Sequence, residues 1–191
     1  MQANIFVSDL FYFPSVHWYA NALVNHSVAL PHAKYNKSYH LNKTTLLSAI
    51  GKINLSIPLL GGREQRLPDN EIAISYAEPW QQNHLKSLKS MYGRAPFFEN
   101  VFPYLENFYT AKFKTLYDCN LHSVLLVNKI LGILLNVEST IDYPVYKQMH
   151  AKDIPYNQVF AIKYGFVENL SILDLLMNEG RYALQILNQM K

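Results

Sequence analysis

The stretch from Glu78 to Tyr109 reads EPWQQNHLKSLKSMYGRAPFFENVFPYLENFY and predicts two consecutive helices, around which the rest of the chain is organised. Pro79 suits the first turn of a helix, because the N–H that proline lacks would have no partner there. Gly93 suits the residue after the helix end, where a left-handed conformation is favoured. Between them, four side chains recur every three or four residues and share one face: Trp80, His84, Leu88 and Met91.

A second helical stretch begins at Pro96. Its apolar residues repeat at helical spacing, but Pro103 removes a backbone hydrogen bond and clashes with the preceding turn. We therefore expect a short turn over 97–102 and a helix that restarts at Pro103. Core packing is the simplest interpretation of the repeating residues, which are Phe98, Val101, Phe102, Leu105, Phe108 and Tyr109.

The composition bounds the class of protein. The chain has 191 residues, of which 50% are hydrophobic and 16% charged, with a formal net charge of +3. Such a chain has enough apolar residues for a sizeable core and is not disordered. We expect one domain over residues 1–191, strand-rich over 1–77 and helix-rich over 78–191. The small net charge gives no ground for nucleic-acid binding, so none is predicted.

Cysteine content and hydropathy bear on location. Cys119 is the single cysteine, so the chain does not resemble a disulfide-stapled secreted domain. Met1 to Leu10 lacks the basic start and long apolar run of a signal peptide. The most apolar segment, Val124 to Val137, is too short to span a bilayer and is interrupted by polar residues. These features predict no membrane span and a cytoplasmic location.

The first thirty residues predict a βαβ-like unit. Asn4 to Val7 and Ser27 to Leu30 are short apolar runs typical of strands, and Pro14 starts a helix between them. Strands joined in this way are parallel. Ligands of such sheets bind beyond the carboxyl ends of the strands, which places Asp9 at one rim and His32 at another.

Further strands and helices complete the predicted fold. Strands are expected at Thr44 to Leu47, and at Lys52 to Pro58 and Glu71 to Tyr76, where apolar residues alternate. A long helix is expected from Lys112 to Leu131, ended by Gly132. A weak strand or loop follows over 136–141, and 143–165 is irregular. The predicted class is α/β, or α+β, with a mixed sheet, an N-terminal βαβ-like unit and a helical C-terminal half.

The last predicted helix has a clear start. Ser171 and Asp174 are spaced as a capping box, with the aspartate in the acidic position. Gly180 ends this helix, and 181–190 continue as a terminal helix. In this interpretation both polar residues serve the helix end.

Few residues carry a recognisable chemical motif. Gly61 and Gly62 with Arg63 could hold a phosphate, although such a pair is more often a turn. The seven histidines show no zinc-ligand spacing, so no metal site is predicted, and no cofactor can be named. His84 follows Trp80 by one helical turn and could transfer protons near neutral pH, or simply pack on the indole ring. Asn120 interrupts an apolar helix face and is either a core tie or a ligand contact.

Several of these segments resemble the WbqC-like protein family. Asn4 to Tyr19, NIFVSDLFYFPSVHWY, is similar to the family's opening strand, aromatic turn and helix. The family's basic cluster has its counterpart at 40–43, where Leu41 and Lys43 stand at family arginine positions. A lysine keeps the charge but lacks the bidentate fork of arginine. Trp80 and His84 match the family's Trp-x-x-x-His helix.

The closing segment carries the most specific part of the resemblance. The family signature there is Y-x-Q followed by N-L-S-I-x-D-L-L-x-N-x-G, and residues 156–180 match it. Asp118 and Asn120 match an Asp-x-Asn in the long helix, and 92–98 match a turn.

The resemblance implies a role in bacterial surface-polysaccharide biosynthesis, with transfer of a small group onto an activated sugar or amino-sugar. In this hypothesis His84 is the general base and Lys43 contacts an anion. The implied substrate-binding residues are Asn42, Lys43, Trp80, Asn120, Tyr156 and Gln158.

The alternative hypothesis is a non-catalytic binding or assembly protein, whose aromatic side chains form an interface, with a homodimer as the first expectation. Leu41, where the family has an arginine, leaves room for an inactive member. The partner is then another protein chain, whereas the enzyme takes a small sugar-type ligand.

Overall fold

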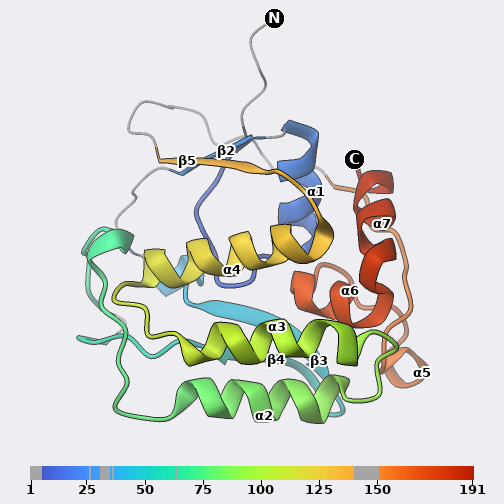
Figure 1. The fold of residues 1–191 in the computed structure, drawn as a ribbon, viewed down its shortest axis with the longest axis horizontal. Helices are drawn as coiled ribbons and strands as arrows, with labels where there is room; N and C mark the ends of the chain where they lie inside the picture. Colours follow the sequence, from blue (N-terminus) through green and yellow to red (C-terminus); the bar gives the residue numbers. More distant parts are fainter. Residues whose placement is uncertain (1–5, 26, 31–34, 36, 63, 140–150) are drawn as a thin grey trace, which may run out of the picture.

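The structure is a computed structural model that describes residues 6–25, 27–30, 35, 37–62, 64–139 and 151–191. It confirms an α/β fold with a helical C-terminal half (Figure 1). The strands are β1 (Phe6–Val7), β2 (Ser27–Leu30), β3 (Lys43–Ser48), β4 (Gly51–Ser56) and β5 (Asn136–Ser139). The α-helices are α1 (Val16–Asn25), α2 (Trp80–Tyr92), α3 (Phe98–Thr110), α4 (Leu116–Leu131), α5 (Ala161–Tyr164), α6 (Ile172–Glu179) and α7 (Ala183–Gln189).

The predicted N-terminal unit is confirmed. Strands β1 and β2 flank α1 in the chain and pair in parallel, with Phe6 opposite Val28. Strand β5 pairs with the other edge of β2, also in parallel, so the three strands form one sheet. Helix α1 buries Val16, Tyr19, Ala20 and Leu23 along one side. His32, expected at the rim of this sheet, lies outside the described residues.

Strands β3 and β4 form a separate antiparallel hairpin, in which Ser48 lies opposite Gly51. Gly51 has a φ of 106°, a conformation that favours glycine because no side chain clashes with the backbone. Leu46, Leu47 and Leu55 are buried. The ends of both strands lie within about two residues of their predicted positions, which is the usual accuracy of bounds predicted from local sequence.

Helix α2 follows its predicted bounds, and its four predicted inward-facing residues are all buried. Gly93 caps the helix, but its φ of −59° is right-handed rather than the expected left-handed conformation. The glycine is needed here for another reason. A Cβ at position 93 would lie 2.6 Å from the carbonyl oxygen of Lys89, which no side chain tolerates.

The prediction that Pro103 restarts a helix is wrong, because α3 runs without interruption through that residue. A proline there leaves the carbonyl of Glu99 without its helical partner. Both Glu99 and Pro103 are exposed, so water can satisfy the carbonyl. The six predicted apolar residues of this helix are buried, which supplies the packing that holds it together.

Two element predictions fail, the first because of tertiary contacts and the second because of a local helix cap. The predicted strand Glu71–Tyr76 forms only isolated bridges, Ile74 with Leu59 and Ala73 with Thr115. This segment divides its hydrogen bonds between two neighbours and so belongs to no ladder. Helix α4 begins at Leu116 rather than at Lys112, because Thr115 and Asp118 form a reciprocal capping box. Gly132 ends the helix as predicted, with a φ of 66°.

The predicted capping box before α6 is half right. Ser171 is the N-cap, and its hydroxyl accepts a hydrogen bond from the N–H of Leu173. The carboxylate of Asp174 does not reach back to the cap. Asp174 is 1% exposed, and its carboxylate accepts hydrogen bonds from three side chains of other segments instead of from the N-cap backbone.

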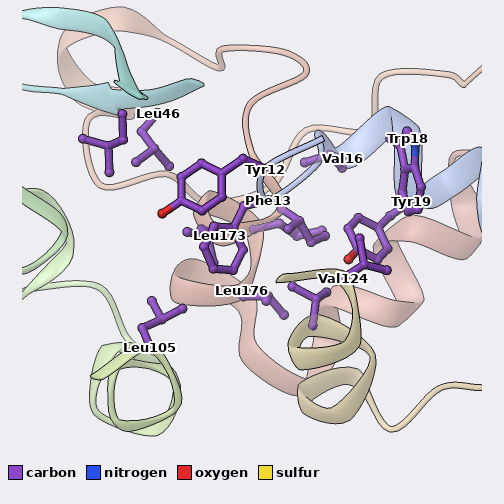
Figure 2. Packing of buried hydrophobic residues seen from close by; sticks show 14 of the residues in the cluster. Tyr12, Phe13, Val16, Trp18, Tyr19, Leu46, Leu105, Val124, Leu173 and Leu176 are labelled. Atoms are coloured by element: carbon purple, nitrogen blue, oxygen red, sulfur yellow. The ribbon is translucent and has the colours of Figure 1, made fainter. Parts of the chain in front are cut away.

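The core gathers side chains from almost every element. Figure 2 shows Tyr12 and Phe13 packed with Leu46 of the hairpin and with Leu173 and Leu176 of α6. Figure 1 shows α2, α3 and α4 lying one above another beside this core. Cys119 is buried, and burial raises the pKa of its thiol. Across the described residues, no helix is both long and apolar enough to cross a bilayer.

Candidate functional site

A cleft of about 380 Å³ opens between the aromatic turn that precedes α1 and the start of the β3–β4 hairpin. Its size is in the range of small-molecule sites in proteins. The loop before α6 closes its third side. The lining residues are Phe11, Phe13, Pro14, Ser15, Trp18, Tyr39, His40, Lys43, Thr44, Thr45, Asn54, Asn169 and Ser171.

Strained backbone is concentrated at this cleft. Among the described residues, the non-glycine residues with positive φ are Phe13 (41°), His40 (56°) and Asn169 (50°). All three line the cleft, although they come from three distant parts of the chain. Such conformations cost energy and tend to persist at functional sites, where the surroundings enforce them. Their convergence marks this cleft as the candidate site.

Three hydroxyl groups enforce the conformation of Phe13. Its N–H donates to the Oγ of Ser123, 3.1 Å away on α4. Its carbonyl accepts from the Oγ1 of Thr44 at 3.0 Å and from the Oγ of Ser171 at 3.1 Å. Both backbone polar groups of this residue are therefore fixed by side chains of α4, β3 and the α6 cap. The turn is held from three sides, which can offset its strain.

The cleft carries positive and neutral polar groups beside aromatic rings. Lys43, His40 and the amides of Asn54 and Asn169 all line it. Among the described residues, none of those that line it is an aspartate or a glutamate. Tyr39 is 50% exposed at its rim. An ammonium group, amides and aromatic surface together suit a sugar that carries a phosphate or another anion.

Lys43 is the one residue of the seven predicted site residues that lines this cleft. Asn42 and Asn120 lie behind its walls. Asn120 donates to the carbonyls of Leu10 at 2.8 Å and Leu41 at 3.0 Å, and Asn42 donates to that of Ile57 at 2.8 Å. These amides join α4 and the segment after β4 to the loops that lead into the cleft lining.

His84 lies in a buried aromatic cluster and is 6% exposed. Its Nδ1 is 3.1 Å from the hydroxyl of Tyr12, which also bonds the hydroxyl of Tyr109. The ring of Trp80 meets the imidazole edge-on, with centroids 5.1 Å apart. Because Tyr12 precedes Phe13, this cluster supports the inner side of the aromatic turn. Trp80 is 3% exposed and belongs to the same cluster.

The buried position of His84 should make stability depend on pH. Burial lowers its pKa to about 4, and a hydrogen bond with the Ser56 backbone offsets part of this effect. An unfolded chain protonates the histidine below its ordinary value of 6.5, whereas the folded chain does so only near 4. Stability from this group is therefore complete above pH 6.5 and is lost as the pH falls towards 4, by about 3 kcal/mol.

Urea unfolding of the wild type and of His84→Gln, at a series of pH values from 7 to 4, measures this effect. The wild type should lose about 3 kcal/mol more than the variant over the series. Burial raises the pKa of Asp174, which acts with the opposite sign, but it is common to both proteins and cancels in the difference. Parallel pH profiles would refute the prediction.

Tyr156 and Gln158 meet at a third place, around the carboxylate of Asp174. The hydroxyls of Tyr156 and Tyr92 donate to it at 2.7 and 2.8 Å, and the Nε2 of Gln158 at 3.2 Å. Burial raises the pKa of Asp174, while these three hydrogen bonds lower it in part. Gln158 also lines a hollow beside Arg94.

The described lining residues other than Lys43 were not predicted as site residues, and they include His40, Asn54 and Asn169. His40 and Asn169 lie inside segments that resemble the family, and that resemblance was the signal that could have found them. Asn54 is an outward-facing strand residue and carries no comparable local signal. No group of three or more histidine, cysteine, aspartate or glutamate side chains is placed to bind a metal within the described residues.

The fold and the cleft define a class: an α/β protein with a ligand-sized, cationic and aromatic site under backbone strain. The sequence model of the WbqC-like protein family matches residues 11–154, well over half of the chain. The chain belongs to this family. The match ends before Tyr156, so it does not include the closing signature. Searches of curated proteins and of solved structures find no match.

Proposed function

We propose that this protein is a transferase acting on an activated sugar or amino-sugar, in bacterial surface-polysaccharide biosynthesis, and that the strained cleft binds the sugar. The observation that carries the proposal is the meeting of all three positive-φ residues, Phe13, His40 and Asn169, in one cleft beside Lys43. Membership of the WbqC-like family is consistent with this biosynthetic role.

Each group in the cleft has a role in this proposal. Lys43 binds the phosphate of the activated sugar, because its ammonium group can donate to several phosphate oxygens. Asn54 and Asn169 bind sugar hydroxyls, and Tyr39 covers an apolar sugar face. His40 takes a proton from the sugar's acceptor hydroxyl or amine as that atom bonds the incoming group. The bond between that group and its activated donor breaks at the same time, and the donor departs with the electron pair.

The predicted role of His84 as the general base remains a prediction, and it requires the imidazole to act from the buried cluster. Its hydrogen bond to Tyr12 suits a positioning role better, since Tyr12 holds the turn that forms the cleft wall. Asn42 and Asn120 position the same walls, and Tyr156 and Gln158 surround Asp174.

The first test is ligand binding. A thermal-shift panel of nucleoside-diphosphate sugars should contain at least one that stabilises the protein, and calorimetry then gives its Kd. Lys43→Met should weaken this binding roughly tenfold to a hundredfold, the loss expected for one charged hydrogen-bond partner. Lys114→Met, which removes an exposed lysine outside the cleft, is the matched control and should bind like the wild type.

Two outcomes would count against the proposal: no stabilisation by any sugar nucleotide, or equal binding by the two methionine variants. His40→Ala separates binding from chemistry. It should keep the affinity for the sugar nucleotide within a few-fold and abolish formation of the transferred product, followed by mass spectrometry.

A binding protein without catalysis is the second candidate. It is favoured by the burial of His84, the predicted base, away from the cleft lining. Under this alternative the sugar nucleotide binds, Lys43→Met still weakens binding, and His40→Ala changes nothing. Light scattering at two protein concentrations tests the accompanying expectation of a homodimer.

A further inference from the structure

Two aliphatic side chains protrude from neighbouring tips of the fold. Ile50, in the turn of the β3–β4 hairpin, is 88% exposed, and Ile162, on α5, is fully exposed. Figure 1 shows α5 beside the end of this hairpin. The contact is direct, because the Nζ of Lys163 and the hydroxyl of Tyr164 donate to the carbonyl of Ala49 at 2.7 and 2.8 Å.

Basic residues line the two hollows beside these tips. Lys86 lines a hollow with Ile50 and Phe160, which places this part of α2 against the hairpin turn. Lys89 and Arg94 line the adjoining hollow, and Phe160 lines both. All three cationic side chains are exposed, as is that of Lys163. We call this region, formed by Ile50, Ile162, Lys86, Lys89, Arg94 and Lys163, the tip surface.

Acidic residues are missing from every segment that builds the tip surface. The chain has 14 aspartates and glutamates, yet none falls in 43–56, 79–98 or 154–167. The carboxylate of Glu179 lies at the edge, where it accepts hydrogen bonds from the backbone N–H and side-chain amide of Asn157. The tip surface therefore combines positive charge with exposed aliphatic side chains. A partner that complements it has an anionic surface and an apolar interior.

We propose that the tip surface docks on an anionic lipid bilayer, with Ile50 and Ile162 entering the acyl boundary and the four cations contacting lipid phosphates. A bilayer accepts single protruding side chains without a matching shape, whereas a protein interface needs a packed, complementary patch around them. Ile50 and Ile162 are single exposed side chains on a hairpin turn and on a short helix, which favours the bilayer. None of the six residues lines the strained cleft, so this proposal is independent of the proposed function.

Flotation of the full-length protein with lipid vesicles tests the proposal. The protein should bind vesicles of phosphatidylglycerol and phosphatidylcholine in equal parts, and bind vesicles of phosphatidylcholine alone at least about tenfold more weakly. Added salt should weaken binding to the anionic vesicles, because ions screen the lysines and Arg94. The double variant Ile50→Ser, Ile162→Ser should weaken it by roughly tenfold or more, since each side chain contributes apolar burial.

Matched controls lie outside the tip surface. Leu134→Ser removes a side chain that is 99% exposed, and it should bind vesicles like the wild type. Lys86→Gln with Lys89→Gln should weaken binding, whereas Lys112→Gln with Lys114→Gln should not. Equal binding to both vesicle compositions, or equal losses in tip and control variants, would overturn the proposal. Binding to an acidic protein but to no vesicle would overturn it as well.

Discussion

Replacing Asp174 with alanine should lower the free energy of unfolding by about 4 kcal/mol, a large effect for one residue. Its carboxylate is 1% exposed and accepts from the hydroxyls of Tyr92 and Tyr156 and the amide of Gln158. Alanine leaves the two hydroxyls buried without this acceptor. The substitution also removes the free-energy cost of burying a carboxylate away from water. The net loss of stability is therefore smaller than the sum of three separate hydrogen bonds.

Asp174→Asn separates the hydrogen bonds from the charge. The amide oxygen can still accept one hydroxyl, and the other hydroxyl can rotate to accept from the amide N–H, so about 2 kcal/mol should be lost. Urea unfolding, followed by circular dichroism, should therefore rank the wild type above Asn and Asn above Ala. A loss below about 1 kcal/mol for the alanine variant would show that this network contributes little to stability.

The sequence predicted elements well where the signal was local. The helix starting after Pro79, the end of α4 at Gly132 and the parallel strands around α1 all depend on residues close in the chain. Backbone propensity, capping and period are determined within about one helical turn. Such signals can be recognised in the sequence without knowledge of the tertiary contacts.

Three of the failures share one physical cause, which is competition from partners distant in sequence. Asp174 has the spacing of a capping box, yet its carboxylate accepts hydrogen bonds from two tyrosines and a glutamine instead. Pro103 should interrupt a helix, yet burial of the apolar face of α3 outweighs one lost hydrogen bond. The segment 71–76 alternates like a strand but finds different partners on each side.

Only part of the candidate site was predicted, because the rest depends on contacts between residues distant in sequence. Lys43 was found through the resemblance to the family, and it lines the cleft. The strained conformation of Phe13 has no local signal, since a phenylalanine rarely adopts a positive φ. It arises from hydroxyls of Ser123, Thr44 and Ser171, which only the folded chain brings together.

Gly180→Ala should be the second severe substitution, with a loss of about 4 kcal/mol from two independent causes. Gly180 has a φ of 53° and a ψ of −123°, a conformation that residues with a Cβ rarely adopt. A Cβ there would also lie 2.2 Å from the Cδ1 of Phe97. That ring cannot easily move, because the N–H of Phe97 donates to the carbonyl of Met177 and its ring packs edge-on against Tyr182.

Gly132→Ala is the control for a positive φ without a steric clash. Gly132 has a φ of 66° and a ψ of 34°, and a Cβ there meets nothing within 4 Å. It should lose only the backbone term, about 1 kcal/mol. The double variant Gly180→Ala with Phe97→Ala removes the clash but keeps the backbone strain. Its loss of stability should therefore be smaller than the sum of the losses of the two single variants. Equal losses at positions 180 and 132 would mean that the ring of Phe97 moves aside freely, and that this turn is looser than the close contact with Gly180 implies.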